Sequence, residues 1–180
     1  RATIHAFELI PSTAAQLRQN TRQFPNIVVH PVALGAATGK ACVQLQPQSY
    51  GNSLKFTVDS DAGGPGQSEV EITTADVFAR ATGISHIDAL KIDAQACDLE
   101  VLQGAAGLLR EQRVTFVYTE VGFDDEDSVQ TQYFNPFHAF LREHGFRLCG
   151  FYEQYNPRIE LEFCNALYFH PGALARRRPN

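Results

Sequence analysis

The sequence lacks methionine and tryptophan altogether, and its first residue is Arg1. Because a translated chain starts with methionine, we expect further residues to precede Arg1 in the natural protein. No apolar run approaches the roughly 18 residues that a membrane-spanning helix needs, and no signal peptide is visible. The sequence therefore predicts a cytoplasmic protein that does not insert into a membrane.

Positive charge is also scarce. The 15 Lys and Arg residues are outnumbered by 20 Asp and Glu residues, which gives a net charge of −5. Nucleic-acid binding needs a basic face, so this balance argues against it. The only basic run, Arg176 to Arg178, is typical of a solvated tail. With 44% hydrophobic residues, the 180-residue chain suits one globular domain with a sizeable core.

Cysteine is sparse, and no two cysteines have the C-x-x-C spacing of a zinc site. No paired histidine motif is present either, so we predict no metal site. We expect every cysteine to be a reduced, small core residue of an intracellular protein. The four cysteines are Cys42, Cys97, Cys149 and Cys164.

Apolar periodicity predicts alternating strands and helices. The first helix should begin at Pro11, with Ser12 or Thr13 as its N-cap. Residues 47–68 are rich in Pro, Gly and Ser, which is typical of a long loop. We predict helices from residue 11 to about 24 and over 75–82, 97–112 and 136–144, and strands over 3–8, 27–34, 41–46, 69–74, 87–93, 114–121, 146–152 and 159–169.

The fold class follows from the order of these elements. Strand 87–93, helix 97–112 and strand 114–121 have βαβ spacing, which predicts parallel pairing with a right-handed crossover. The last two strands, joined through Asn156 and Pro157, should form an antiparallel hairpin. We therefore predict one α/β domain with an open, doubly wound and mostly parallel sheet between two helical layers.

Three of the predicted strands carry an acidic residue at their carboxyl end: Glu8, Asp93 and Glu120. In a doubly wound sheet, ligands bind at the carboxyl ends of the strands. In folds of this class, a carboxylate at the end of the second strand of the sheet suits a nucleotide ribose, because it can accept hydrogen bonds from both hydroxyls. Alternatively, Glu8 could simply interact with the dipole of the helix that follows it.

Six segments in order resemble the FkbM-type family of S-adenosylmethionine-dependent methyltransferases. The first five segments match from about residue 4 to residue 122, and the sixth resembles the family's last strand. The most specific part is the run from Lys91 to Gly104. The resemblance implies a Rossmann-like fold whose seven-stranded sheet ends in an antiparallel strand. It also implies methyl transfer from S-adenosylmethionine to a hydroxyl of a small molecule or sugar. The segments are "HAFELIPST", "NIVVHPVALGAATGKACVQL", "EVEITTADVFA", "IDALKIDAQACDLEVLQGAAGLL", "VTFVYTEV" and "CNALYFH".

The resemblance also implies cofactor contacts. It places Glu8 on the ribose and Asp93 beside the methyl donor. The adenine ring would lie against the end of the third strand of the family fold, which here is Val32, Ala33 and Leu34.

We take Asp93, Lys91 and Glu120 as the candidate catalytic residues. Lys91 should leave the sheet on the same face as Asp93, two residues later. A lysine in a covered strand needs a partner, for which Glu120 is the candidate, and a purely structural ion pair is the alternative. None of the six histidines stands out as a base, so the general base stays unassigned.

The sequence departs from the family pattern in two places. After "KID" the family has a Val-Glu-Gly-like stretch, where this chain has Ala94, Gln95 and Ala96. The family's first strand and its glycine-rich loop, which precede the Glu8 strand, are absent. In the family fold that first strand lies between the second strand, which here is 3–8, and the fourth, which here is 87–93. Its loss should leave a gap of roughly 10 Å with unpaired backbone on both sides.

Two other functions compete with an O-methyltransferase. A strand-two acid also suits NAD, which would make the chain an oxidoreductase, although the later motifs argue against this. A non-catalytic domain of methyltransferase shape is favoured by Gln95 and Ala96.

The run Asp124 to Asp127 is typical of a solvated loop, or it could form the rim of a substrate lid with Tyr133, Phe134 and Phe137. Nothing in the sequence excludes a homo-oligomer.

Overall fold

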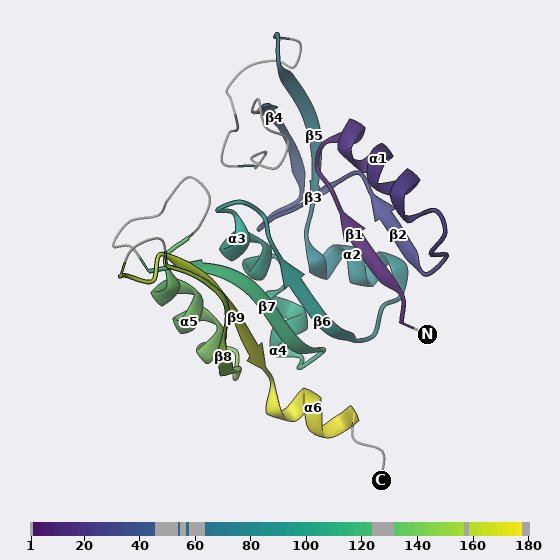
Figure 1. The fold of residues 1–180 in the computed structure, drawn as a ribbon. Coiled ribbons are helices and arrows are strands. Elements are labelled where there is room, and N and C mark those ends of the chain that lie inside the picture. The colour runs from purple at the N-terminus through teal and green to yellow at the C-terminus, as the bar shows by residue number, and fades with distance from the viewer. Residues whose placement is uncertain are drawn as a thin grey trace.

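The computed structural model describes residues 2–45, 54, 57, 64–123, 132–156 and 159–177. Most of the expected loop at 47–68 and the acidic run at 124–127 lie outside these residues. The α/β class is confirmed, because helices and strands alternate along the chain (Figure 1). In chain order the elements are β1 (Ile4–Phe7), α1 (Pro11–Thr21), β2 (Ile27–His30), β3 (Ala33–Leu34), β4 (Gly39–Gln44), β5 (Gln67–Thr73), α2 (Ala75–Thr82), β6 (Ile87–Ile92), α3 (Asp98–Gln103), α4 (Ala106–Arg110), β7 (Val114–Gly122), α5 (Phe134–Glu143), β8 (Arg147–Tyr155), β9 (Phe163–Phe169) and α6 (Pro171–Arg177).

The N-terminal unit is a parallel pair, β1 and β2, connected through α1. Pro11 lies in the first turn of α1, where a missing N–H is tolerated. The N-cap is Ile10, which makes no side-chain cap bond, so the predicted capping by Ser12 or Thr13 is wrong. A single strand over 27–34 is also wrong. The chain bends at Pro31 and Val32, and β3 pairs with β5 instead of extending β2.

The C-terminal part contains a sheet with the strand order β6-β7-β9-β8. The predicted parallel pairing of β6 and β7 is confirmed, and β9 runs antiparallel to both β7 and β8. The helix predicted over 97–112 is divided at Gly104 into α3 and α4. A Cβ on Gly104 would clash with the backbone oxygen of Gly35, so this close approach requires glycine.

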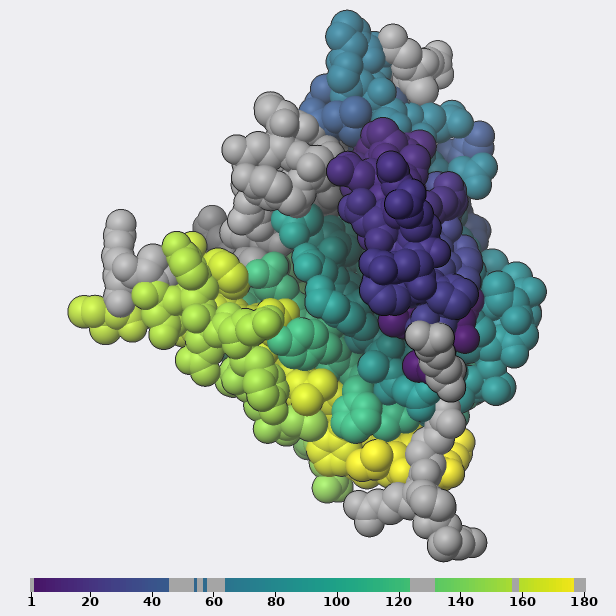
Figure 2. All heavy atoms as spheres, turned by 45° about the vertical axis from the view of Figure 1, so that its right-hand side comes forward, coloured from purple at the N-terminus to yellow at the C-terminus, as the bar shows by residue number. Residues whose placement is uncertain are grey.

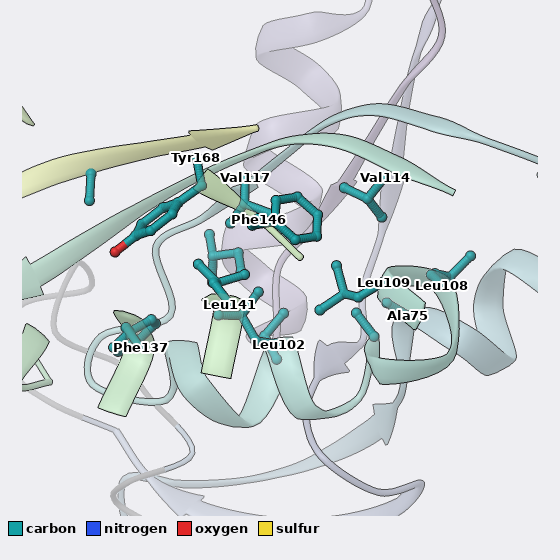
Figure 3. Packing of buried hydrophobic residues seen from close by; sticks show 14 of the residues in the cluster. Ala75, Leu102, Leu108, Leu109, Val114, Val117, Phe137, Leu141, Phe146 and Tyr168 are labelled. Carbon is teal, nitrogen blue, oxygen red and sulfur yellow. The ribbon is translucent and has the colours of Figure 1, made fainter. Parts of the chain in front are cut away.

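The main core lies on one face of this sheet. Leucines of the α3–α4 segment pack against β7, and α5 adds Phe137 and Leu141 (Figure 3). Along β7, Val117 and Thr119 are fully buried, whereas Tyr118 and Glu120, which alternate with them, are only partly covered. The sheet therefore has one covered face and one open face.

The cysteines are free thiols. Cys42, Cys97 and Cys164 are buried, as predicted. Cys149 is exposed, and the prediction for it is wrong, because it lies on the edge strand β8 where the pairing register shifts. None of the helices in the described part of the chain combines the length and the hydrophobicity required to span a bilayer.

Candidate active site

A cavity of about 960 Å³ separates β1 from β6, and every residue of both strands lines it. β1 pairs only with β2 and β6 only with β7, and no strand among the described residues lies between them. Figure 2 shows the N-terminal segment, in purple, standing beside the teal part of the chain that contains β6. The wall of the cavity is mostly apolar, since β1, β6 and α2 contribute mainly Ala, Ile, Leu and Phe.

The strand edges that face this cavity carry backbone groups without a strand partner. The N–H groups of Ile4 and Glu8 donate toward β2, and that of Ile87 donates toward β7. Backbone groups alternate sides along a strand, so those of Phe7 and Leu90 point the other way, into the cavity. Two facing edges of this kind match the gap expected from the sequence.

Glu8 lies directly after β1 and lines the cavity. Its Oε1 accepts a hydrogen bond from the backbone N–H of Ile10, the N-cap residue of α1, at 2.9 Å. One oxygen of Glu8 is therefore used at the start of that helix. Its Oε2 accepts no hydrogen bond from any described residue. The ribose prediction and the helix-start alternative are therefore compatible, because each uses a different oxygen.

The structure gathers all the predicted cofactor residues around this one cavity. Glu8 comes from the end of β1 and Asp93 from the end of β6, while the segment 32–34 follows β2 and includes β3. Lys91 also contributes to the lining, whereas Glu120 lies outside it, at the end of the neighbouring β7.

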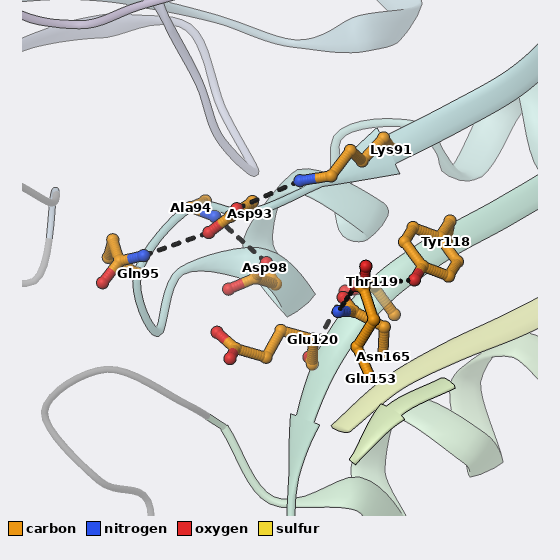
Figure 4. Close-up of polar contacts among 10 residues, drawn as sticks. All are labelled: Lys91, Asp93, Ala94, Gln95, Asp98, Tyr118, Thr119, Glu120, Glu153 and Asn165. Carbon is orange, nitrogen blue, oxygen red and sulfur yellow. Dashed lines mark hydrogen bonds and ion pairs between the residues drawn. The ribbon is translucent and has the colours of Figure 1, made fainter. Parts of the chain in front are cut away.

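Both oxygens of Asp93 are occupied (Figure 4). Lys91 Nζ donates to Oδ2 at 3.0 Å, and Gln95 Nε2 donates to Oδ1 at 3.0 Å. Lys91 therefore pairs with Asp93 and not with Glu120, its candidate partner in the sequence. Residues two apart in a strand share a face, so the Asp93 carboxylate is the nearer one.

The turn after Asp93 has an unusual backbone. Gln95 has φ 50° and Ala96 has φ 64°, both in the left-handed region that favours glycine. The family glycine that Ala96 replaces would fit this conformation without strain. Gln95 has a clear local role, because its amide supplies a donor to Asp93 that a glutamate could not supply.

Asp98, which the sequence analysis did not single out, is the most deeply buried acid of the site, with 2% of its surface exposed. It begins α3 and accepts the Ala94 N–H at 3.1 Å. Burial raises its pKa to about 7, and the charges of Asp93 and Glu120 add to this effect. An acid in the first turn of a helix is common, so only its burial after folding distinguishes it.

Glu120 is half-buried at the end of β7. Burial raises its pKa first, the charge of Asp93 raises it further, and Lys91 opposes both. Its carboxylate accepts no hydrogen bond from the described residues. In Figure 4 the carboxyl groups of Glu120 and Asp98 are neighbours and point to the same side.

The histidines lie away from these strand ends. His5 and His30 hydrogen-bond to each other at 3.0 Å and stack within an aromatic cluster with Phe7 and Phe78. The other four contact Thr115, Tyr168, Phe140 and the start of α6, through His86, His138, His144 and His170 respectively.

The lid alternative is not supported. Phe137 is fully buried in the core, and Phe134 stacks on Phe123 at a ring distance of 5.5 Å. A side chain held in the core cannot close over a substrate. Within the described ranges, no group of three His, Cys, Asp or Glu residues could hold a metal ion.

Comparison with known proteins agrees with this arrangement. The family model described as "Methyltransferase FkbM domain" matches residues 1–148. The chain is 25% identical over 129 residues to the "Hexuronic acid methyltransferase AglP" of Haloferax volcanii, covering 71% of this chain and 51% of AglP. It therefore spans about half the length of that curated relative.

A solved structure shares the fold. The crystal structure of the methyltransferase FkbM from Methylobacillus flagellatus KT superposes with a TM-score of 0.55 at 14% identity, covering 93% of this chain and 36% of that chain. The likeness in fold and the match of the family model over most of the sequence lead to one conclusion. This chain belongs to the FkbM methyltransferase family.

Proposed function

We propose that the chain is the core of an S-adenosylmethionine-dependent O-methyltransferase with a Rossmann-like, three-layer fold. One observation carries this proposal. The residues expected to contact the nucleoside, Glu8, Val32 to Leu34 and Asp93, are far apart in the sequence and line one cavity.

The residues present fit the cofactor chemically. Glu8 has one oxygen available for the ribose hydroxyls, and the segment 32–34 offers an apolar surface for the adenine ring. When bound, S-adenosylmethionine supplies an electrophilic methyl group on a positively charged sulfur. Asp93 suits that charge, because Lys91 and Gln95 hold its carboxylate in one orientation at the end of β6.

The acceptor class is proposed to be a hydroxyl on a sugar. The name of AglP assigns it to hexuronic acids, and the present chain shares a quarter of its aligned residues with AglP. A sugar hydroxyl has a high pKa, so the protein must align it and take its proton.

We further propose that one additional strand lies between β1 and β6. The facing edges of these strands present unpaired backbone groups, which are costly to leave without partners. Such a strand would join the β1–β2 pair to the β6-β7-β9-β8 sheet and fill part of the cavity between them.

A non-catalytic binding domain is the second candidate, and the Gln95–Ala96 turn favours it. The two proposals differ in their predicted use of the acceptor, and not in cofactor binding.

Calorimetry with S-adenosylhomocysteine tests the methyl-donor site in the full-length natural protein. We expect binding, and we expect Glu8→Gln to weaken it at least tenfold because one ribose contact is lost. Glu143→Gln, on the exposed surface of α5, is the matched control and should bind as the wild type does. Absence of binding by the wild type would reject the methyl-donor site, and equal affinity of Glu8→Gln would reject the ribose role.

A further inference from the structure

Methyl transfer to a hydroxyl needs a group that takes the hydroxyl proton, and no histidine of the described chain lies at the carboxyl ends of β6 and β7. Resting on the proposed function, we propose that Glu120 is this proton acceptor and that Asp98, buried beside it, is a positioning residue that controls its protonation. Neither role was assigned by the sequence, which left the base open.

The strand register brings Glu120 to the site. Ile92 of β6 pairs in parallel with Thr119 of β7, so the following residues, Asp93 and Glu120, are neighbours at the carboxyl ends of these strands. Ligands bind at the carboxyl ends of the strands in a parallel sheet. Glu120 therefore lies next to the cavity that Asp93 lines, although it is not part of the cavity wall.

Glu120 also has access to an acceptor molecule. In the register of β6 and β7, Lys91 lies opposite Tyr118, and Glu120 follows Tyr118 by two residues. All three side chains therefore leave the sheet on its open face. Helices α3, α4 and α5 cover the opposite face, where Thr119 is fully buried. An acceptor can therefore approach Glu120 from the open face.

The other acids of the site are less suitable. Asp93 is committed to Lys91 and Gln95 through both oxygens, so both are already used as hydrogen-bond acceptors within the protein. Asp98 is 2% exposed and bonded to Ala94, so an acceptor cannot reach it directly. Glu120 is the acid at this edge whose carboxylate no described donor occupies.

The charges around Glu120 suit the role. Burial and the charge of Asp93 raise its pKa, which makes it a stronger base, and Lys91 limits the rise. Asp98, with a pKa of about 7, can hold a proton next to Glu120 at physiological pH. Cys164 lies opposite Val121 in the strand register and is buried in the core, and its pKa is raised to about 11 by burial and by the charge of Glu120, so it remains a neutral thiol.

The proposed step balances as a displacement. The acceptor oxygen loses its proton to a carboxylate oxygen of Glu120 and forms a bond to the transferred methyl carbon. The electron pair of the broken carbon–sulfur bond stays on the sulfur of the methyl donor, which becomes a neutral thioether. No oxidant, reductant or metal ion is needed.

The first test does not depend on activity. Carboxyl groups are labelled with carbon-13 and titrated by NMR in the cofactor-free protein. We expect Glu120 and Asp98 both to titrate above their ordinary values, and Glu120→Gln to lower the pKa of Asp98 because a neighbouring charge is lost. Glu143→Gln should leave the titration of Asp98 unchanged. If Asp98 titrates identically in the wild type and in Glu120→Gln, the coupling is disproved.

The second test separates binding from proton transfer. With any hydroxyl acceptor that the wild type methylates, we expect Glu120→Gln to lower kcat at least 100-fold while the affinity for S-adenosylhomocysteine stays within twofold. Glu120→Asp keeps a carboxylate and should retain more activity than Glu120→Gln. In Asp98→Asn, the acidic limb of the pH–kcat profile should shift.

The outcomes are distinguishable. Full activity of Glu120→Gln overturns the role of Glu120, whereas loss of cofactor affinity in the same variant assigns it to binding instead. A wild-type protein that binds no S-adenosylhomocysteine fails the proposed function, independently of the NMR result.

Discussion

Gln95 donates a hydrogen bond from its side-chain amide to Asp93, with 3.0 Å between Nε2 and Oδ1. The family pattern has an acid at this position, and an acid here would face a second carboxylate. Together with Lys91, the amide fixes Asp93 from two sides. The departure from the family motif is thus locally consistent, because it replaces a repulsive neighbour by a donor.

The replacement can be tested by restoring the acid. Gln95→Glu should destabilise the protein by about 0.5–1 kcal/mol at pH 7.5, since two carboxylates then lie side by side. Protonation removes the repulsion, so the difference should shrink at pH 4. Urea unfolding at both pH values measures it. Gln16→Glu adds the same charge on the exposed side of α1 and should have little effect; equal losses in both variants would argue against the contact.

The buried acid Asp98 predicts a pH-dependent stability. Its pKa is about 7 in the folded chain, against an ordinary value of 3.8 for an aspartate, so between these pH values the folded state holds the proton and the unfolded state does not. Stability from this group is complete below about pH 4 and is lost as the pH rises to about 7, up to about 4 kcal/mol. Asp98→Asn keeps an acceptor for Ala94 and should remove that loss.

Urea unfolding of the wild type and of Asp98→Asn between pH 4 and pH 8 checks this prediction. The variant should gain stability relative to the wild type as the pH increases. A difference that stays constant across this range would mean that Asp98 is ionised in the folded protein.

The stacked pair His5 and His30 predicts the opposite trend. Burial lowers the pKa of His30, and His5 and Arg18 lower it further. The folded state therefore favours the neutral ring, so stability is lost as the pH falls below about 6.5. His30→Phe preserves an aromatic ring in the cluster and should make the melting temperature less sensitive between pH 5 and pH 7. An unchanged pH dependence would contradict the assignment.

Gly104 predicts a steric effect. Gly104→Ala would drive a Cβ into the backbone oxygen of Gly35, so the α3–α4 corner or the end of β3 must move. We expect a loss of about 2–3 kcal/mol in the free energy of unfolding. Gly39→Ala is the control, because a Cβ at Gly39 meets nothing within 4 Å. Similar unfolding free energies for the two variants would show that the corner adapts without cost.

Local patterns predicted the parts of the fold that local forces determine. The β6–β7 unit was readable because apolar residues change from strand to helical periodicity and back within one stretch. The breaks at Pro31 and Gly104 were missed for different reasons. Proline is tolerated in edge strands, so its effect depends on the neighbour. The approach of Gly35 to Gly104 joins segments distant in sequence.

The candidate site shows the same limit. Glu8 and Asp93 could be predicted because strand ends are visible in the sequence, and the cavity brings them together. Asp98 could not be selected, because its burial depends on the packing of α3 against the sheet. The partner of Lys91 was missed because two acids were in reach, and side-chain distances decide between them.

The position of the cavity links ligand binding to cooperativity. It lies at the seam between the β1–β2 unit and the β6-β7-β9-β8 sheet, which share no backbone hydrogen bonds across it. Phe7 and His5 of β1 make aromatic contacts with Phe78 of α2, the helix whose Ala75 and Ala79 pack in the core of that sheet. A ligand bound there contacts both units at once, so it stabilises their docking by a free energy that grows with the logarithm of its concentration once that concentration exceeds its Kd. Hydrogen exchange in β1 is therefore expected to slow upon cofactor binding more than exchange in β9.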